Sequence, residues 1–153
     1  MHERTLGYSV RLLADIKERP PTVDTEFWRP AQDGALSGLR PTPNDALAGF
    51  EPLDTKRFCL VAVTVFDLDD FIEDVCEERG DSRWWQQNYF SRIAELDERD
   101  GWKLLGFDIA NSWLQVNHSK PLFQDYEKAE NFRVQQEDNE DLEIFVFGVY
   151  RQM

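Results

Sequence analysis

The chain has 153 residues, of which 41% are hydrophobic, and this is the size and composition of one globular domain. Seventeen basic residues against thirty acidic residues give a formal net charge of −13. Such a charge repels nucleic-acid phosphates and anionic lipids, so it argues against direct binding to DNA, RNA or a membrane and favours a basic partner.

The first predicted element is a strand near residues 5–16, where apolar residues such as Leu6 and Tyr8 alternate with polar ones and share one face. A helix through Leu6, Val10 and Leu13 is the alternative. Residues 19–56 contain six of the seven prolines and three glycines, which excludes long regular elements there. We expect this stretch to be a mostly ordered connection with a short helix near residues 44–48. The whole chain, residues 1–153, is predicted to form one domain that includes this connection.

A continuous apolar run rich in valine predicts a central strand near residues 57–67. Apolar residues then recur at helical spacing and predict a helix near residues 69–79. At 100° per residue, its apolar residues fall on one half of the circumference and its acidic residues on the other half. The acidic residues are Asp69, Asp70, Glu73, Asp74, Glu77 and Glu78. They are candidate contact residues for a basic partner. The alternatives are a solvated helix face and a calcium site, and calcium sites favour loop carboxylates rather than those of a regular helix.

A second helix is predicted near residues 84–99, with Ser82 as its N-cap and Gly101 after its end. Its inward positions are Trp85, Tyr89, Ile93 and Leu96. Adjacent residues on a helix point in different directions, so Trp85 is assigned to the core and Trp84 is a candidate contact residue for a partner.

Two more strands are predicted near residues 102–110 and 142–151, and the second of these is apolar on both faces and therefore central. A short third helix is predicted through Leu122, Tyr126, Ala129 and Phe132. The acidic stretch that follows it contributes Asp138 and Asp141 as further candidate contact residues. The fold class is therefore α+β, a mostly antiparallel sheet of four or five strands packed against two or three helices.

Cys59 and Cys76 lie in apolar stretches without CxxC spacing, so we expect two reduced, buried thiols. His2 and His118 have no neighbours at metal-ligand spacing, so no metal and no cofactor are expected. The N-terminus lacks an apolar run of signal-peptide length, and nowhere do 18 apolar residues follow one another. We therefore expect a soluble cytoplasmic protein.

Residues 65–70, Val-Phe-Asp-Leu-Asp-Asp, resemble the first motif of the haloacid dehalogenase superfamily. The resemblance implies Asp67 as a nucleophile and Asp69 as an acid and base, with Mg²⁺ held between carboxylates. The superfamily continues with Gly-Thr where this chain has Asp70-Phe71, and it also needs a phosphate-binding lysine and a later acidic pair beside a parallel strand. A Mg²⁺-dependent phosphotransferase therefore stays an alternative, and no catalytic residue is assigned.

Residues 104–109, 113–114, 127–133 and 146–151 resemble small bacterial immunity proteins of polymorphic toxin systems. The resemblance implies a cytoplasmic protein that is not an enzyme and that neutralises one cognate toxin by occluding its active site. High acidity also suits an inhibitor of a basic protein. A nucleic-acid mimic that occupies a DNA-binding protein is a further alternative, because only the spacing of the carboxylates and the partner would differ.

Overall fold

The computed structural model describes residues 3–12, 22–23, 39–48, 50, 52, 54–79, 82–96, 101–110, 120–121, 123–140 and 144–153. Four strands form an antiparallel sheet in the order β1 (Glu3–Leu12), β3 (Phe58–Phe66), β6 (Phe145–Gln152) and β4 (Trp102–Ala110). A second, two-stranded sheet pairs β2 (Thr22–Val23) with β5 (Lys120–Pro121). The helical elements are α2 (Pro43–Leu47), α3 (Leu68–Arg79), α4 (Ser82–Asn88), the 3-10 helix η1 (Phe90–Arg92) and α5 (Tyr126–Glu140). The predicted α+β class is confirmed.

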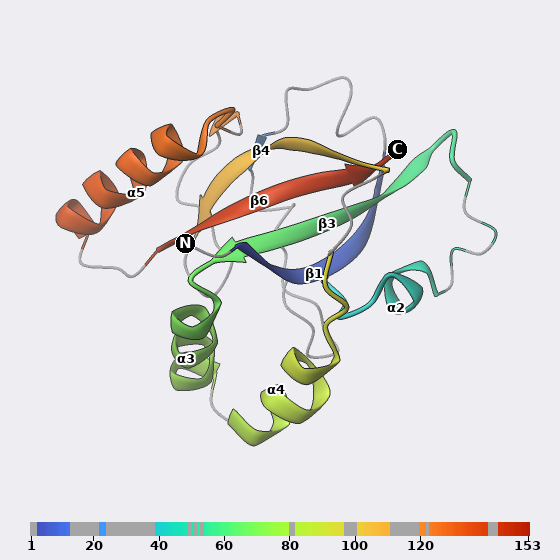
Figure 1. The fold of residues 1–153 in the computed structure, drawn as a ribbon, viewed down its shortest axis with the longest axis horizontal. Helices are drawn as coiled ribbons and strands as arrows, with labels where there is room; N and C mark the ends of the chain where they lie inside the picture. The colour runs from blue at the N-terminus through green and yellow to red at the C-terminus, as the bar shows by residue number, and fades with distance from the viewer. Residues whose placement is uncertain are drawn as a thin grey trace.

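The two central strands, β3 and β6, are buried on both faces of the sheet. Helices α3 and α4 lie on one side of the sheet and α5 on the other (Figure 1). Coverage on both sides explains why these strands have continuous apolar sequences rather than alternating ones. The predictions of central strands near residues 57–67 and 142–151 are therefore confirmed.

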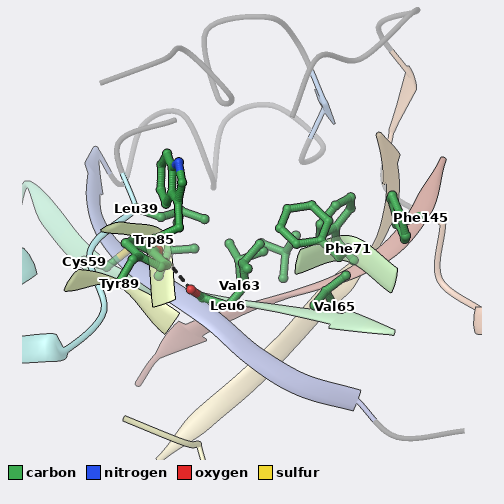
Figure 2. Close-up of a cluster of buried hydrophobic side chains, with 12 residues drawn as sticks. Leu6, Leu39, Cys59, Val63, Val65, Phe71, Trp85, Tyr89 and Phe145 are labelled. Carbon is green, nitrogen blue, oxygen red and sulfur yellow. Dashed lines mark hydrogen bonds between the residues drawn. The ribbon is translucent and has the colours of Figure 1, made fainter. Parts of the chain in front are cut away.

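On the first face, Val63 and Val65 of β3 pack with Phe71 of α3 and Trp85 of α4. Figure 2 shows Phe71 beside Phe145 at one end of this cluster and Trp85 at the other. The rings of Phe71 and Phe145 meet edge to face, with centroids 5.3 Å apart. The apolar half of α3 thus faces the core, as its periodicity predicts.

The second face has two smaller clusters. Tyr8 and Leu60 pack with Ala46 of α2. Ile109 and Val146 pack with Ala129 of α5. Helix α5 therefore covers the region where β3 and β4 end and β6 begins.

The alternation in the first strand is interrupted by a β-bulge. The register of β1 against β3 shifts between Thr5 and Gly7, so Leu6 is an additional residue. Leu6 consequently packs in the core beneath α3 and α4, whereas Tyr8 belongs to the cluster on the opposite face. The predicted regular alternation, with Leu6 and Tyr8 on the same face, is wrong at this point. Residues 13–16 of the predicted strand lie outside the described residues.

The other edge strand, β4, has the same irregularity between Leu104 and Gly106. Both edges also have a short pairing partner from another part of the chain. Arg40 forms a bridge outside β1, and Phe123 forms one outside β4. Each edge is thus bulged and partly covered.

The predicted helix near residues 84–99 is shorter than expected. Helix α4 ends at Asn88, the backbone of Tyr89 leaves the helical region, and after η1 the chain is extended at Ile93 and forms no regular element up to Leu96. This segment is held by β1, because the Leu96 N–H donates to the Thr5 hydroxyl at 2.8 Å. A long-range contact therefore ends a helix that local periodicity would continue.

The third predicted helix is longer than expected. Helix α5 begins at Tyr126 and continues to Glu140, past Phe132 and into the acidic stretch that follows it. The Asp125 carboxylate accepts a hydrogen bond from the Glu127 N–H at 2.9 Å, so Asp125 caps the first turn. Leu122 lies outside the described residues.

The connection at residues 19–56 is described only in part. Its predicted short helix is confirmed as α2, where the Thr42 hydroxyl accepts from the Asp45 N–H at 3.1 Å. Of the two free cysteines, Cys59 is buried and Cys76 is only half-buried. Within the described ranges, no helix is both long enough and apolar enough to cross a bilayer.

Candidate functional site

The acidic half of α3 forms a continuous surface. Asp69, Asp70, Glu73 and Glu77 are exposed and Asp74 is half-buried. We call these five residues the acidic face. Residues four apart on a helix have neighbouring side chains, so these carboxylates form two adjacent rows along α3.

The carboxylates of the acidic face have no ion-pair or hydrogen-bond partner among the described residues. The arginines that do form ion pairs reach other elements, for example Arg4 with Glu95 at 2.9 Å and Arg92 with Asp45 at 3.0 Å. The helix macrodipole favours Asp69 and Asp70 in the first turn. It does not favour Glu77, which lies near the C-terminus of the helix.

Trp84 lies on α4, the helix that follows α3, and 38% of it is exposed. Its ring meets that of Trp85 edge to face with centroids 5.0 Å apart, while Trp85 is 6% exposed. The assignment of Trp85 to the core is confirmed. The ring of Trp84 thus lies at the surface in contact with a buried neighbour.

The remaining candidate contact residues are described only in part. The backbone of Glu78 belongs to α3, and that of Asp138 belongs to α5, on the other side of the sheet. Their side chains and the whole of Asp141 lie outside the described part of the chain. The candidate surface is therefore α3 with Trp84.

A cavity of about 60 Å³ opens beside the first turn of α3, between α3 and α5. Its polar lining comes from Asp67 and Asp70 on one side and from Glu130 and Arg133 of α5 on the other. Phe66, at the end of β3, and residues 144–146, at the start of β6, complete the lining. Asp70 belongs to both the cavity and the acidic face, so the two features are continuous.

The α5 side of the cavity is an ordered polar group. The Arg133 guanidinium donates two hydrogen bonds to the Glu130 carboxylate, one of them from Nε at 2.9 Å. This hydrogen-bonded arginine lowers the pKa of Glu130 below its usual range. Burial, followed by the nearby Glu130 and Asp67 carboxylates, raises the pKa of Tyr126. The positive charge of Arg133 thus compensates the negative charge of Glu130. The charges of Asp67 and Asp70 are the uncompensated ones in the lining.

Asp67 connects β3 to α3 in a left-handed conformation, with φ of 63°. Aspartate tolerates this conformation better than most residues other than glycine and asparagine do. Its carbonyl oxygen accepts the first hydrogen bond of the helix, from the Phe71 N–H at 3.0 Å. The bend places Asp67 at the cavity.

The resemblance to the haloacid dehalogenase motif lacks its structural setting. Asp67 lines the cavity together with Asp70, and Asp69 is not part of the lining. Every pair of neighbouring strands in the described sheets is antiparallel, whereas the motif requires a parallel arrangement. In the described part of the chain, no group of three or more His, Cys, Asp or Glu side chains is arranged to hold a metal ion.

The sequence does not predict the cavity. The spacing of Tyr126, Glu130 and Arg133 on one helix is a local signal for an interacting group. The approach of this group to Asp67 depends on the packing of α5 at the end of the sheet. Sequence periodicity contains no information on that contact.

Comparison with known proteins gives no relative from which a function could be transferred. No family profile, no curated protein and no solved structure matches the chain. The resemblance to immunity proteins therefore stays a prediction.

Proposed function

We propose that this chain is an inhibitory binding protein that applies the acidic face of α3 to a basic surface of its partner, a bacterial toxin. The observation that carries the proposal is the set of exposed carboxylates on α3 without a cation among the described residues. Carboxylates elsewhere in the fold, such as Glu95, Asp45 and Glu130, have arginine partners.

The self-repulsion of α3 supports this proposal. Like charges four residues apart on a helix each cost a few tenths of a kcal/mol, so the pairs Asp69–Glu73, Glu73–Glu77 and Asp70–Asp74 together cost about 1 kcal/mol. A cationic surface bound against α3 relieves this cost and adds attraction across the interface. The free protein is thus less stable than it could be, in a way that favours complex formation.

Trp84 adds an exposed apolar side chain on α4, the helix that follows α3 in the chain. Tryptophan is enriched among the residues that dominate binding energy, and a held ring loses little conformational freedom on binding. The edge-to-face contact with Trp85 provides that restraint. We therefore assign Trp84 as the apolar contact of the same interface.

In this mechanism the protein inhibits its partner by occupying the partner's cationic cleft. Electrostatic attraction speeds the encounter with a cationic cleft, and the folded domain then excludes the substrate of the toxin. No chemical step on the partner is required.

The test is capture of partners with the tagged full chain in its native host at low and at high salt, followed by mass spectrometry. We expect one stoichiometric basic protein that is toxic when expressed alone and harmless when co-expressed with this chain. With that protein purified, Glu73→Lys/Glu77→Lys should slow association by at least about tenfold and reduce its salt dependence.

A matched comparison uses the single changes Glu73→Lys on α3 and Glu127→Lys on α5, since both residues are exposed and both changes add the same charge. Only the change on α3 should slow association markedly. Equal effects of the two variants would indicate attraction to net charge alone and would reject α3 as the interface.

A further inference from the structure

We infer that the cavity between α3 and α5 is a subsite that receives one cationic side chain, an arginine or a lysine, from the partner. This inference rests on the proposed function, since it assigns a specific contact within the same interface. It depends on the charge, the size and the position of the cavity.

The charge of the lining favours a cation. Asp67, Asp70 and Glu130 contribute three negative charges and Arg133 one positive charge, so the formal sum is −2. The Arg133 guanidinium already donates two hydrogen bonds to the Glu130 carboxylate. Asp67 and Asp70 have no ion-pair or hydrogen-bond partner for their side chains among the described residues. They are thus available to a donor that enters the cavity.

The size of the cavity fits a side-chain head group. One enclosed water requires roughly 10–15 Å³, so a cavity of about 60 Å³ has space for about four water molecules. A guanidinium group has four heavy atoms and an ammonium group has fewer, so either one fits. The exposed lining is mainly polar, which suits the charged head group of an arginine or lysine.

The position of the cavity connects it to the proposed interface. Asp70 contributes to both surfaces, so a side chain that extends from a partner on α3 reaches the cavity at the first turn of that helix. The fixed pair of Glu130 and Arg133 forms its far wall. A preorganised wall lowers the cost of ordering the site on binding.

The test is a titration of the ¹⁵N-labelled full chain with small probes, followed by NMR. The probes are N-acetyl-arginine amide, N-acetyl-lysine amide and, as the uncharged isostere of arginine, N-acetyl-citrulline amide. We expect saturable shifts of the amides of residues 66–71 and 130–133 with the two cationic probes, with dissociation constants on the order of millimolar. Citrulline should produce no saturable shift.

The variant Asp67→Asn/Asp70→Asn should weaken binding of the arginine probe by about tenfold. Asparagine tolerates the left-handed conformation at residue 67, so the fold is expected to be preserved. The matched control is Asp69→Asn/Glu73→Gln, which removes the same charge from the acidic face but leaves the cavity lining intact. The control should weaken binding by less than about twofold.

Several results would overturn the inference. These are no saturable shift with either cationic probe, equal binding of citrulline, equal weakening in the two double variants, or shifts with Mg²⁺ but not with the arginine probe. The experiment contains no protein partner, so its outcome is separate from that of the proposed function. If Glu73→Lys/Glu77→Lys slows association with the partner while the probes do not bind, the interface stands and only the subsite is rejected.

Discussion

The hydroxyl group of Tyr89 donates a hydrogen bond to the carbonyl oxygen of Leu6 at 2.9 Å. Leu6 is the additional residue of the bulge in β1, and Tyr89 is the residue at which the chain leaves α4. The bond therefore joins an irregular point of the sheet to the end of a helix, as Figure 2 shows. It also explains Gly7, because a Cβ at that residue would lie 2.5 Å from the Tyr89 hydroxyl oxygen.

Replacing Tyr89 with phenylalanine should lower the free energy of unfolding by about 1–2 kcal/mol. The change leaves the buried Leu6 carbonyl without this donor while keeping the ring in the core. Urea unfolding followed by tryptophan fluorescence measures the difference. An unchanged midpoint would show that the hydrogen bond contributes nothing to stability.

Tyr89 should also make the free energy of unfolding depend on pH in the alkaline range. Burial raises the pKa of Tyr89, although Arg40 acts in the opposite direction. The stabilisation that results from this raised pKa is fully present below the pKa of an unfolded tyrosine, about 10. It is lost as pH rises toward the higher pKa of the folded state. The free energy of unfolding of the wild-type protein should thus decrease above pH 10 more steeply than that of Tyr89→Phe. The slope of the difference should approach 1.4 kcal/mol per pH unit.

Gly7→Ala should destabilise the fold by about 2–3 kcal/mol, because the added carbon meets the Tyr89 hydroxyl, the Leu39 Cβ at 2.9 Å and the Arg40 carbonyl at 3.0 Å. Removing the hydroxyl in Gly7→Ala/Tyr89→Phe should recover part of this loss but not all of it, since the other two contacts remain. A double-mutant cycle by chemical denaturation measures this coupling. Strict additivity of the two changes would contradict the proposed clash.

Replacing Arg133 with methionine should raise the pKa of Glu130 toward its ordinary value, because the hydrogen-bonded arginine is the main cause of the lowered pKa. A lowered pKa stabilises the fold fully above the ordinary glutamate pKa, about 4.3, and this stabilisation is lost as pH falls through the lowered value. The pair is about one quarter exposed, so the loss at neutral pH should be at most about 1 kcal/mol. NMR titration of the Glu130 side-chain carbon and thermal unfolding at pH 7 and pH 3 test both statements.

Glu73→Gln/Glu77→Gln should stabilise the free protein by about 0.3–1 kcal/mol at low salt, because it removes repulsion along α3. High salt should reduce this gain, since it screens the charges that the variant removes. Glu127→Gln is the control, because Glu127 lies in the first turn of α5, where the macrodipole favours a negative charge. Thermal melts should therefore show opposite signs for the two variants.

The parts of the fold that the sequence predicts are those fixed by local pattern. The valine-rich run before Asp67 and the four-residue spacing of Ile72 and Cys76 predict β3 and α3, since their periodicities describe which faces are buried. The bulge at Leu6 and the end of α4 at Asn88 are not predictable in this way. Both depend on contacts between β1 and residues 89–96, more than 80 residues away in the chain.

The candidate site likewise has one part that the sequence predicts, the acidic face, and one part that it does not, the cavity. The acidic face follows from the spacing of carboxylates on one helix, and its exposure agrees with that spacing. The cavity requires Asp67 to meet Glu130 and Arg133, which are more than 60 residues further along the chain. Only the packed structure shows that Asp67 has Asp70, rather than Asp69, as its neighbour in the lining.

The covered edges of the sheet restrict how another chain can bind. An exposed, regular edge strand is a template for strand addition and for aggregation. Here a strand arriving at β1 or β4 would have to displace the bridges made by Arg40 or Phe123 and to match a bulged register. Extension of the sheet by a partner is thus disfavoured, and recognition is directed to side chains on the helices.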